Sequence, residues 1–369
     1  MLRFDRRLLQ NFDWVMVAAV LLVGLLGLLN LYSASSLDRE LGSAVFVKQL
    51  SYFLLGFMVI LVITLVDYKV LIKWNYPIYG LALFLLLAVL LVGGEVAGTQ
   101  RWLNFVFFRL QPSEPAKLAL VITLASYYYR KDTGKGFTIK ELLLPIALAA
   151  VPFGLIIMQP DLGTGMMLGF IFLSMTLFVK LKWSAILSMA GAAAAVIPLG
   201  WKFYLKPYQQ ERILTFLSPD SNPLGSGYHI TQSKIAVGSG TTFGKGYMEG
   251  TQAHLDFLPE RHTDFAFSVW AEEWGFIGSL FFLACYFFII LWGMNIALTA
   301  RDKFGVLLAF GVVSLIFWQA TINLGMVLGL LPVVGMPLPL FSYGGSSLLT
   351  TMAGIGILIN IRMRRFMTP

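Results

Sequence analysis

The sequence carries very little charge for its length. Asp, Glu, Lys and Arg make up 12% of its 369 residues, whereas soluble domains carry roughly twice that fraction. Hydrophobic residues make up 58% of the chain, with 30 Phe and 9 Trp among the aromatics. This composition excludes a soluble globular protein and predicts a polytopic helical membrane protein.

Cysteine and histidine are scarce as well. The single cysteine, Cys285, lies in an apolar run, so a disulfide within one chain is excluded and the redox compartment is left undecided. The three histidines, His229, His254 and His262, lack the paired spacing of a zinc motif. The sequence therefore predicts no metal site.

Nucleotide and nucleic-acid binding lack their usual signals. The net charge of +8 is not gathered in a basic domain with interleaved aromatics, so it favours contact with anionic lipid and not with nucleic acid. The glycine-rich residues 238–246 fail as a phosphate loop, because Ser239 and Gly246 stand at two required positions. They also fail as a dinucleotide fingerprint, because Phe243 replaces the third glycine. These glycines are expected to serve turns and close approach to a partner surface.

Long apolar runs recur along the chain, and ten of them are expected to cross a membrane as helices. They cover residues 13–35, 44–66, 76–93, 113–129, 141–158, 165–179, 184–204, 265–292, 305–330 and 344–361. The first run ends in Ser-Ala-Ser, which resembles a signal-peptide cleavage site, but its apolar core of about 20 residues favours a retained helix. The segment QPDLGT joins the fifth and sixth runs and predicts a tight helical hairpin. The expected fold class is an all-α polytopic membrane protein that forms one domain over residues 1–369.

Lys and Arg are distributed unequally between the two sides of these runs. One side carries sixteen of them, and the short loops of the other carry only Arg39, Lys48, Arg101 and Arg109. Because cytoplasmic loops are enriched in Lys and Arg, both termini are expected in the cytoplasm. The long loop of about residues 205–264, between the seventh and eighth helices, is then extracytoplasmic and is expected to contain short interfacial helices.

Charged residues inside apolar runs are costly and mark candidate functional sites. Glu114 and Lys117 are three residues apart, so they are expected to pair on one helix face. They could bind substrate, or they could form an internal ion pair that only makes both residues tolerable. Asp161 lies in the QPDLGT turn, where it could equally be an ordinary turn aspartate. Glu272 and Glu273 lie within the eighth run, and the sequence does not name their partners.

The segment LPERHTDFAFSVWAEEWG at 258–275 places His262 and Asp264 directly before the eighth apolar run. Asp264 could meet both a lipid head group and water at this boundary, or Thr263 or Asp264 could simply cap the helix. Acids next to fixed cations at the outer end favour a phosphate-bearing substrate handled by an acid–base group. The cations expected near this end are Arg101, Arg109, Lys117, Arg212, Lys234 and Arg261.

The segment PLPLFSYGGSS at 337–347 opens the last apolar run. Its prolines and paired glycines predict a non-helical outer segment that leads into a helix. The hydroxyls of Ser342, Ser346 and Ser347 could donate hydrogen bonds into a cavity. The alternative is a loop whose small residues make a tight helix–helix contact.

Six blocks of this sequence together resemble one protein family. They are QRWLNF at 100–105, RLQPSEPAKLAL at 109–120, QPDLGT at 159–164, DSNPLGSGYHITQSKIAVGSG at 220–240, LPERHTDF at 258–265 and the serine-glycine segment at 337–347. In this order they resemble the SEDS family of bacterial wall-synthesis proteins over nearly the whole chain. The block GTQAHLDFLPERHTDF is more similar to the elongation members of the family than to the division members.

The resemblance implies a peptidoglycan glycosyltransferase of the bacterial cytoplasmic (inner) membrane that polymerises lipid II at the outer face during elongation and cell-shape maintenance. Asp264 matches the family's essential aspartate and would act as general base, with undecaprenyl pyrophosphate as the leaving group. The expected partners are a class B penicillin-binding protein, other elongation-complex proteins and membrane lipid. A divalent cation, Mg²⁺ or Mn²⁺, could assist, although no residue cluster demands one. The candidate substrate-binding residues are Arg101, Trp102, Arg109, Glu114, Lys117, Asp161, Arg212, Lys234, His262 and Ser342.

Two other functions fit part of the pattern. A transporter that flips lipid II would also need intramembrane charges and a polar cavity. Against it, the cytoplasmic half carries almost no buried charge in the sequence, and no clear inverted repeat is present. A non-catalytic scaffold for a penicillin-binding protein would leave the clustered charges unexplained.

Overall fold

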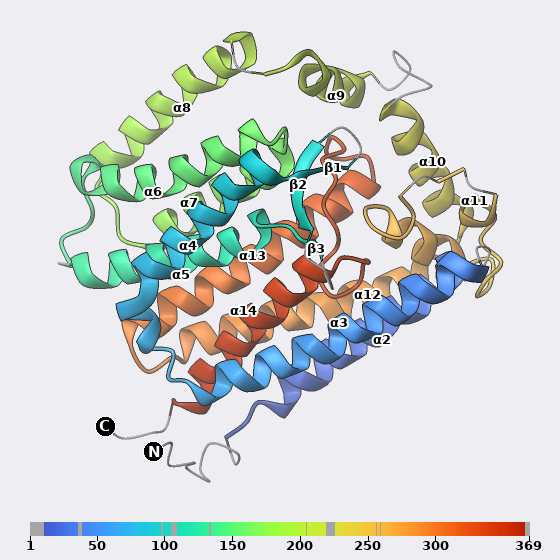
Figure 1. Ribbon diagram of the computed structural model, residues 1–369, viewed down its shortest axis with the longest axis horizontal. Helices are drawn as coiled ribbons and strands as arrows, with labels where there is room; N and C mark the ends of the chain where they lie inside the picture. The colour runs from blue at the N-terminus through green and yellow to red at the C-terminus, as the bar shows by residue number, and fades with distance from the viewer. Residues whose placement is uncertain are drawn as a thin grey trace.

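The computed structural model describes residues 11–35, 39–96, 99–104, 109–132, 134–203, 205–218, 226–255, 257–258 and 260–365. Most of its long helices run side by side in one bundle (Figure 1). They are α2 (Trp14–Ser35), α3 (Arg39–Leu65), α4 (Val70–Val92), α5 (Ser113–Lys131), α6 (Ile139–Met158), α7 (Leu162–Phe178), α8 (Trp183–Phe203), α12 (Ala266–Leu298), α13 (Lys303–Val327) and α14 (Gly345–Met363).

Eight of these helices are long and apolar enough to cross a membrane: α2, α3, α4, α6, α8, α12, α13 and α14. The all-α polytopic membrane fold is therefore confirmed. The other two, α5 and α7, lie where the fourth and sixth spans were expected. Because α5 carries Glu114 and Lys117 and α7 has only 17 residues, the count of ten spans stays a prediction.

The centre of the bundle is formed by α13 and α14. In α14, 83% of the most apolar stretch is buried, compared with 6% in α8. The central helices are enclosed by α3, which packs on α14, and by α5 and α12, which pack on α13. Helix α8 lies apart from them at the periphery and continues toward α9 (Figure 1). The polar groups carried by α13 and α14 are therefore the ones held most firmly.

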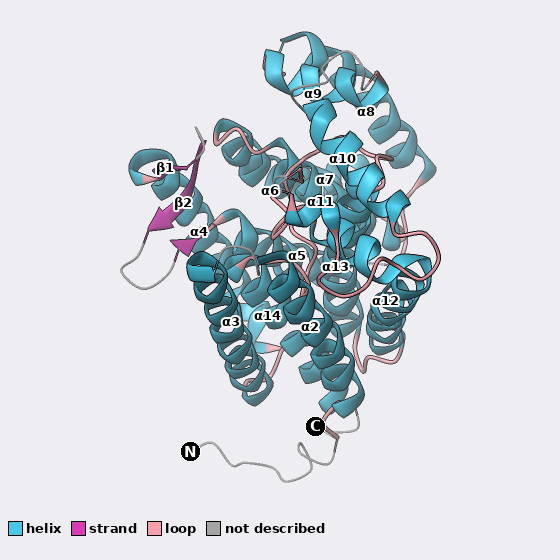
Figure 2. Ribbon diagram, turned by 90° about the vertical axis from the view of Figure 1, so that its right-hand side faces the viewer, coloured by secondary structure: helices cyan, strands magenta, loops and turns pink. Residues whose placement is uncertain are grey.

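The start of α2 and the end of α14 lie at the same end of the bundle (Figure 2). Asp13, directly before α2, is buried there and forms an ion pair with Arg362 of α14 at 3.1 Å. Trp292 Nε1 donates to the same carboxylate at 2.9 Å. The sequence-based expectation that this end carries almost no buried charge is thus wrong for Asp13.

The long loop contains the short helices expected of it. They are α9 (Pro207–Leu217), α10 (Ser226–Ser239) and α11 (Thr251–His254). A small antiparallel sheet was not expected; its strands are β1 (Gly94–Val96), β2 (Thr99–Asn104) and β3 (Arg109–Leu110), in that spatial order. The sheet forms because Gly93 and Gly94 end α4 and the next residues pair as a hairpin, which carries Arg101 toward the α6–α7 turn.

Helix α12 is broken near its start at Gly275, whose φ of 65° and ψ of −160° are not helical. A straight helix from Ala266 to Leu298 would be about 50 Å long, well beyond the roughly 30 Å of a bilayer core. The break leaves Phe276–Leu298 as a segment of ordinary spanning length. The eighth apolar run, expected to be one helix, is therefore two helical pieces, and Asp264 precedes the shorter one.

Candidate functional site at the start of α12

Asp264 lies in a turn directly before α12 and does not cap that helix. The residue that begins the helix is Phe265, and no side chain donates or accepts a capping bond there. The turn closes through Phe265 N and Thr263 N, which both donate to the carbonyl of Glu260. Glu260 has a φ of 52°, a left-handed conformation that costs energy in a non-glycine residue. The capping explanation of Asp264 is therefore wrong, and its carboxylate is available for another role.

The surroundings of Asp264 raise its pKa to about 7. Burial is the largest cause, and the negative charges of Glu260 and Asp161 act in the same direction. The positive charges of Arg212 and Arg101 lower the pKa and so oppose these effects. A carboxyl that titrates near neutral pH can accept a proton and later release it, which is what a general base requires.

An open cavity lies between the α6–α7 turn, helix α9 and the loop after α13. Its polar lining includes Arg101 and Arg212, and one wall includes Val333 and Val334. Arg212 Nη1 donates to the carbonyl of Val333 at 3.4 Å. The residue after Val334, Gly335, has a φ of 70°, and a Cβ atom placed on it would lie 3.4 Å from Asp264 Oδ2. The carboxylate of Asp264 therefore lies against the loop that forms this wall.

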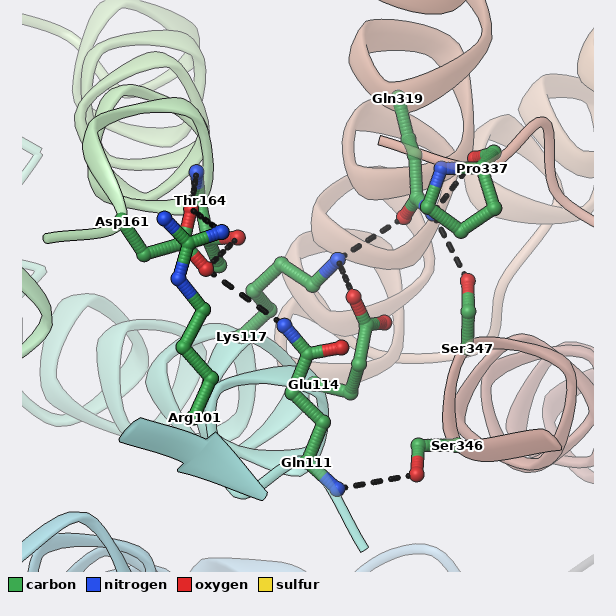
Figure 3. Close-up of polar contacts among 10 residues, drawn as sticks. All are labelled: Arg101, Gln111, Glu114, Lys117, Asp161, Thr164, Gln319, Pro337, Ser346 and Ser347. Carbon is green, nitrogen blue, oxygen red and sulfur yellow. Dashed lines mark hydrogen bonds and ion pairs between the residues drawn. The ribbon is translucent and has the colours of Figure 1, made fainter. Parts of the chain in front are cut away.

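Arg101 and Asp161 face each other at the cavity, with 3.7 Å between the guanidinium and the carboxylate (Figure 3). Asp161 also caps α7, since its two oxygens accept from Thr164 N at 3.2 Å and Thr164 Oγ1 at 2.9 Å. Arg101 donates further to the carbonyls of Gln159 and Pro160. Asp161 is thus an ordinary turn and capping residue, which was one of the two alternatives from the sequence. It is also the charge partner of Arg101 at the cavity.

Glu114 and Lys117 form the expected ion pair on α5, at 2.9 Å (Figure 3). Both side chains are buried, and Lys117 Nζ also donates to Gln319 Oε1 at 3.0 Å. Neither residue is among those that line the cavity. The pair is therefore internal in this structure, and substrate binding by it stays a prediction.

The other predicted cations lie away from the cavity lining. Arg109 is exposed, and its carbonyl accepts from Ser346 Oγ. Lys234 of α10 is also exposed, and its stem lies over Gly329 after α13. Trp102 pairs with Gly94 in the sheet. The roles predicted for Arg109, Lys234 and Trp102 stay predictions.

His262 and Ser342 connect the turn before α12 to the loop before α14. The carbonyl of His262 accepts from Tyr343 N at 2.9 Å. Ser342 is buried, and its Oγ accepts from Leu338 N at 3.0 Å. Its main contact is therefore within the loop, whereas the sequence suggested a hydrogen bond into a cavity.

Two further neighbours of Asp264 were not recognised from the sequence. His229 of α10 stacks on Phe265 with 6.2 Å between ring centroids. Burial lowers the pKa of His229, with Glu260 raising it and Arg212 lowering it. Asn323 of α13 donates to the carbonyl of Asp264 at 2.8 Å. An amide in the apolar run 305–330 was the signal that could have identified Asn323.

Within the described ranges, no three His, Cys, Asp or Glu side chains gather closely enough to hold a metal ion. A divalent cation therefore stays a prediction from the sequence, with no ligand cluster among the described residues to which it can be assigned. The site consists instead of two carboxylates, Asp161 and Asp264, and two guanidinium groups, Arg101 and Arg212.

Residues 13–366 match the FTSW_RODA_SPOVE family, described as "Cell cycle protein". This chain belongs to that family, the SEDS family. It is 40% identical over 357 residues to the peptidoglycan glycosyltransferase MrdB of Escherichia coli K12, covering 97% of this chain and 95% of that protein. It is 36% identical over 370 residues to a probable peptidoglycan glycosyltransferase FtsW of Geobacter metallireducens, covering 98% and 97%.

Solved structures of similar proteins have the same SEDS fold. A chain from a peptidoglycan synthase complex that coordinates polymerisation and crosslinking matches with a TM-score of 0.83 and 32% identity, covering 97% of this chain and 99% of that one. The rod shape determining protein RodA of Thermus thermophilus matches with a TM-score of 0.70 and 29% identity, covering 97% and 98%. Membership of the SEDS family makes this chain a multi-pass protein of the bacterial inner membrane.

Proposed function

We propose that this chain is a peptidoglycan glycosyltransferase that polymerises lipid II at the outer face of the cytoplasmic membrane during cell elongation, with Asp264 as general base. The activity is supported by the relatives named peptidoglycan glycosyltransferase, to which the chain is similar over nearly its full length. The observation that carries the role of Asp264 is its pKa of about 7, next to a cavity with two arginines.

The reaction joins two lipid-linked sugars by one displacement. The 4-hydroxyl of the acceptor GlcNAc attacks the anomeric carbon of the donor MurNAc, and Asp264 takes the hydroxyl proton. The bond from that carbon to undecaprenyl pyrophosphate breaks, and the linkage inverts from α to β. Arg101 and Arg212 are placed to stabilise the negative charge of the leaving pyrophosphate, since both line the cavity. Asp161 is proposed to hold Arg101, and the other candidate residues are proposed to bind more distant parts of lipid II.

The proposal includes a topology of ten spans with both termini in the cytoplasm. The eight long apolar helices, together with α5 and α7, make ten. In this arrangement the long loop and Asp264 face outward, where lipid II is polymerised. The unequal distribution of Lys and Arg supports the orientation.

The proposed partners are a class B penicillin-binding protein, which would supply crosslinking, and other proteins of the elongation complex. The likeness to a chain from a peptidoglycan synthase complex supports the first of these. Membrane lipid surrounds the apolar helices, and lipid II is the substrate.

The test is polymer formation from lipid II by the purified chain in complex with its penicillin-binding protein. Asp264→Asn keeps the side-chain size and cannot accept the proton, so the rate should fall by about 10²–10⁴ while lipid II still binds. Asp161→Asn is the matched control and should lose less, because in our proposal Asp161 takes no proton from the substrate and acts through Arg101.

Other outcomes would favour other functions. Near wild-type polymerisation by Asp264→Asn would remove Asp264 as the base. If wild-type protein formed no polymer with its partner but moved lipid II between leaflets, a flippase would replace the glycosyltransferase. If it did neither and only bound the penicillin-binding protein, it would be a scaffold.

A further inference from the structure

Helix α13 presents two amides one turn apart, Gln319 and Asn323, and both are 0% exposed. Neither has a part in the chemistry proposed above. A buried amide is costly unless its polar atoms are hydrogen-bonded, so the bonds that these two side chains make show what holds them in an otherwise apolar helix.

Asn323 joins Asp264 to the loop after α13. Its Nδ2 donates to the carbonyl of Asp264 at 2.8 Å and to the carbonyl of Met336 at 2.7 Å. Both acceptors are carbonyl oxygens, so the amide must present its NH₂ group here, and both of its hydrogens are used. A hydroxyl has one hydrogen and could not hold both segments.

These two bonds fix the position of the Asp264 carboxylate from two sides. One holds its main chain in a turn that no capping side chain secures. The other holds Met336, the neighbour of Gly335, and a Cβ atom at Gly335 would lie 3.4 Å from Asp264 Oδ2. The distance between the carboxylate and the loop that faces it therefore depends on Asn323.

Gln319 extends the same arrangement by one residue. Its Nε2 donates to the carbonyl of Pro337 at 3.1 Å and to Ser347 Oγ at 2.8 Å (Figure 3). Its Oε1 accepts from Lys117 Nζ at 3.0 Å. Successive carbonyls of the loop are thus held by successive amides of α13, and the Glu114–Lys117 pair of α5 is tied to the same loop.

Asn323 Oδ1 is buried and accepts no hydrogen bond from the described residues. An unsatisfied buried acceptor is destabilising. A leucine would remove this acceptor, but it would leave the carbonyls of Asp264 and Met336 without their donor. The asparagine therefore meets its own cost through the two carbonyls that it holds in a fixed relation.

We infer that Asn323 is a positioning residue for Asp264, which holds the carboxylate at the distance from the acceptor hydroxyl that proton transfer requires. A general base acts within about 2.6–3.2 Å of the proton's oxygen, and catalytic groups must be held to within about 0.5 Å. Gln319 supports Asn323 by fixing the next residue of the loop. This inference rests on the proposed function.

The test uses the full chain in complex with its penicillin-binding protein and measures polymerisation of lipid II against substrate concentration and pH. Asn323→Leu should lower kcat at least about tenfold and change KM less than about twofold, because the base is misplaced while the binding groups remain. A looser carboxylate is better hydrated, so the acid limb of the pH profile should move to lower pH. Asn323→Gln keeps both donors on one nitrogen and should recover part of the rate.

Asn360 of α14 provides a matched control at the opposite end of the bundle. It is 1% exposed, and its Nδ2 also donates to two carbonyls, those of Ile63 and Val66. Asn360→Leu should lower thermal stability but leave kcat per folded molecule and the pH profile unchanged. Asn323→Leu behaving like Asn360→Leu in all three measurements would overturn the inference.

If Asn323→Leu folds poorly, Asn323→Gln provides the test, because its amide is displaced by one methylene. A reduced kcat with a shifted acid limb supports positioning, and wild-type values of both overturn it. Failure of the inference is distinct from failure of the proposed function. In the first case wild type polymerises lipid II and the Asn323 variants match it, and in the second wild type itself forms no polymer.

Discussion

Opposing influences hold the pKa of the Asp264 carboxyl near neutral pH. Burial and the charges of Glu260 and Asp161 raise its pKa, and Arg212 and Arg101 lower it, to a result of about 7. The folded protein therefore prefers the protonated form more strongly than an unfolded chain does. The resulting loss of stability grows as pH rises from about 4 to about 7, so the proposed base destabilises the fold in the pH range where it would accept a proton.

The first prediction follows from these opposing charges. Replacing Glu260 by Gln removes a negative neighbour, so the pKa of Asp264 should fall and the acid limb of polymerisation should move to lower pH. Replacing Arg212 by Gln removes a positive neighbour, so the limb should move to higher pH. The measurement is kcat/KM for lipid II between pH 5 and pH 9.

The control for this pair is Lys135→Gln, which alters an exposed charge on the opposite side of the predicted topology. It should leave the midpoint of the acid limb unchanged. Shifts of the same sign in Glu260→Gln and Arg212→Gln, or no shift in either, would show that Asp264 is not the titrating group.

The second prediction concerns the Glu114–Lys117 pair. Lys117→Met leaves a buried carboxylate without its cation, which costs about 3–5 kcal/mol when a buried pair is broken. Glu114→Gln combined with Lys117→Met should cost less than the sum of the two single changes. The measurement is the free energy of unfolding of all four forms in detergent.

An exposed pair of similar geometry provides the comparison. Lys303 and Asp132 lie 2.6 Å apart, with the lysine side chain 71% exposed, and such surface pairs are worth about 0–1 kcal/mol. Their double-mutant cycle should therefore show little coupling. Strict additivity at Glu114 and Lys117 as well would mean that this buried pair does not interact.

The break in α12 is held open by a loop from earlier in the chain. Phe276 N and Ile277 N donate to the carbonyls of Thr241 and Thr242, which replace the missing helical acceptors. In return, Lys245 N donates to the carbonyl of Glu272 at 3.0 Å. The chain thereby satisfies the main-chain groups that the break exposes.

Glu272 secures this loop from within α12. Its side chain is 0% exposed, and Oε1 accepts from Lys245 Nζ at 2.6 Å and from Thr251 Oγ1 at 3.1 Å. Glu273 accepts from Ser33 of α2. The partners that the sequence could not name are therefore residues of the long loop and of the first long helix.

The third prediction tests the close packing of this loop. Gly244 has a φ of 83°, and a Cβ atom on it would lie 2.1 Å from the carbonyl oxygen of Glu273. Gly244→Ala should therefore destabilise the protein and lower polymerisation, because backbone must move on both sides. Gly238, in α10, has nothing within 4 Å of such an atom, so Gly238→Ala should be neutral or stabilising by up to about 1 kcal/mol.

The two alanine variants are compared by thermal unfolding in the same detergent. Equal stability of Gly244→Ala and wild type would mean that the loop does not need to enter the break in α12. The sequence-based expectation of close approach holds for Gly240 and Gly244, which lie against α12 of the same chain, and not for Gly238. Close approach to a partner surface stays a prediction.

The long helices could be predicted because the length and polarity of each apolar run can be read directly from the sequence. The break at Gly275 could not, since its hydrogen-bond partners lie some thirty positions earlier and nothing local to α12 signals them. The same limit applies at the site. Asp264 was identified from its own neighbourhood and family resemblance, whereas Asn323 depends on a contact across 59 positions.

Polar clusters lie at both ends of the bundle, and they differ in whether they adjoin a cavity. Near the start of α12, Arg101, Asp161, Arg212 and Asp264 surround or adjoin an open cavity. At the other end, Asp13 is enclosed by Arg362 and Trp292, whose ring lies 4.5 Å from the guanidinium. These three residues connect the start of α2 to α12 and α14 and have a structural role. The first cluster, with its cavity and its two arginines, is the one that we propose handles the substrate.

The fourth prediction places these two ends relative to the membrane. In a Cys285→Ser background, Thr231→Cys on α10 should react with an impermeant thiol reagent in intact cells. Lys135→Cys, between α5 and α6, should react only after permeabilisation. Both positions are exposed, so the difference would report sidedness and not burial.

Trp14, the first residue of α2, is 66% exposed. A cysteine at this position should be labelled like Lys135→Cys, because the Asp13–Arg362 ion pair holds the start of α2 and the end of α14 on one side. The reverse pattern at all three positions would invert the orientation. Asp264 would then face the cytoplasm, and polymerisation at the outer face would be impossible with this aspartate as base. Labelling of Thr231→Cys and Lys135→Cys from the same side would instead contradict the proposed ten-span topology, in which α6, α7 and α8 all cross the membrane between these two positions.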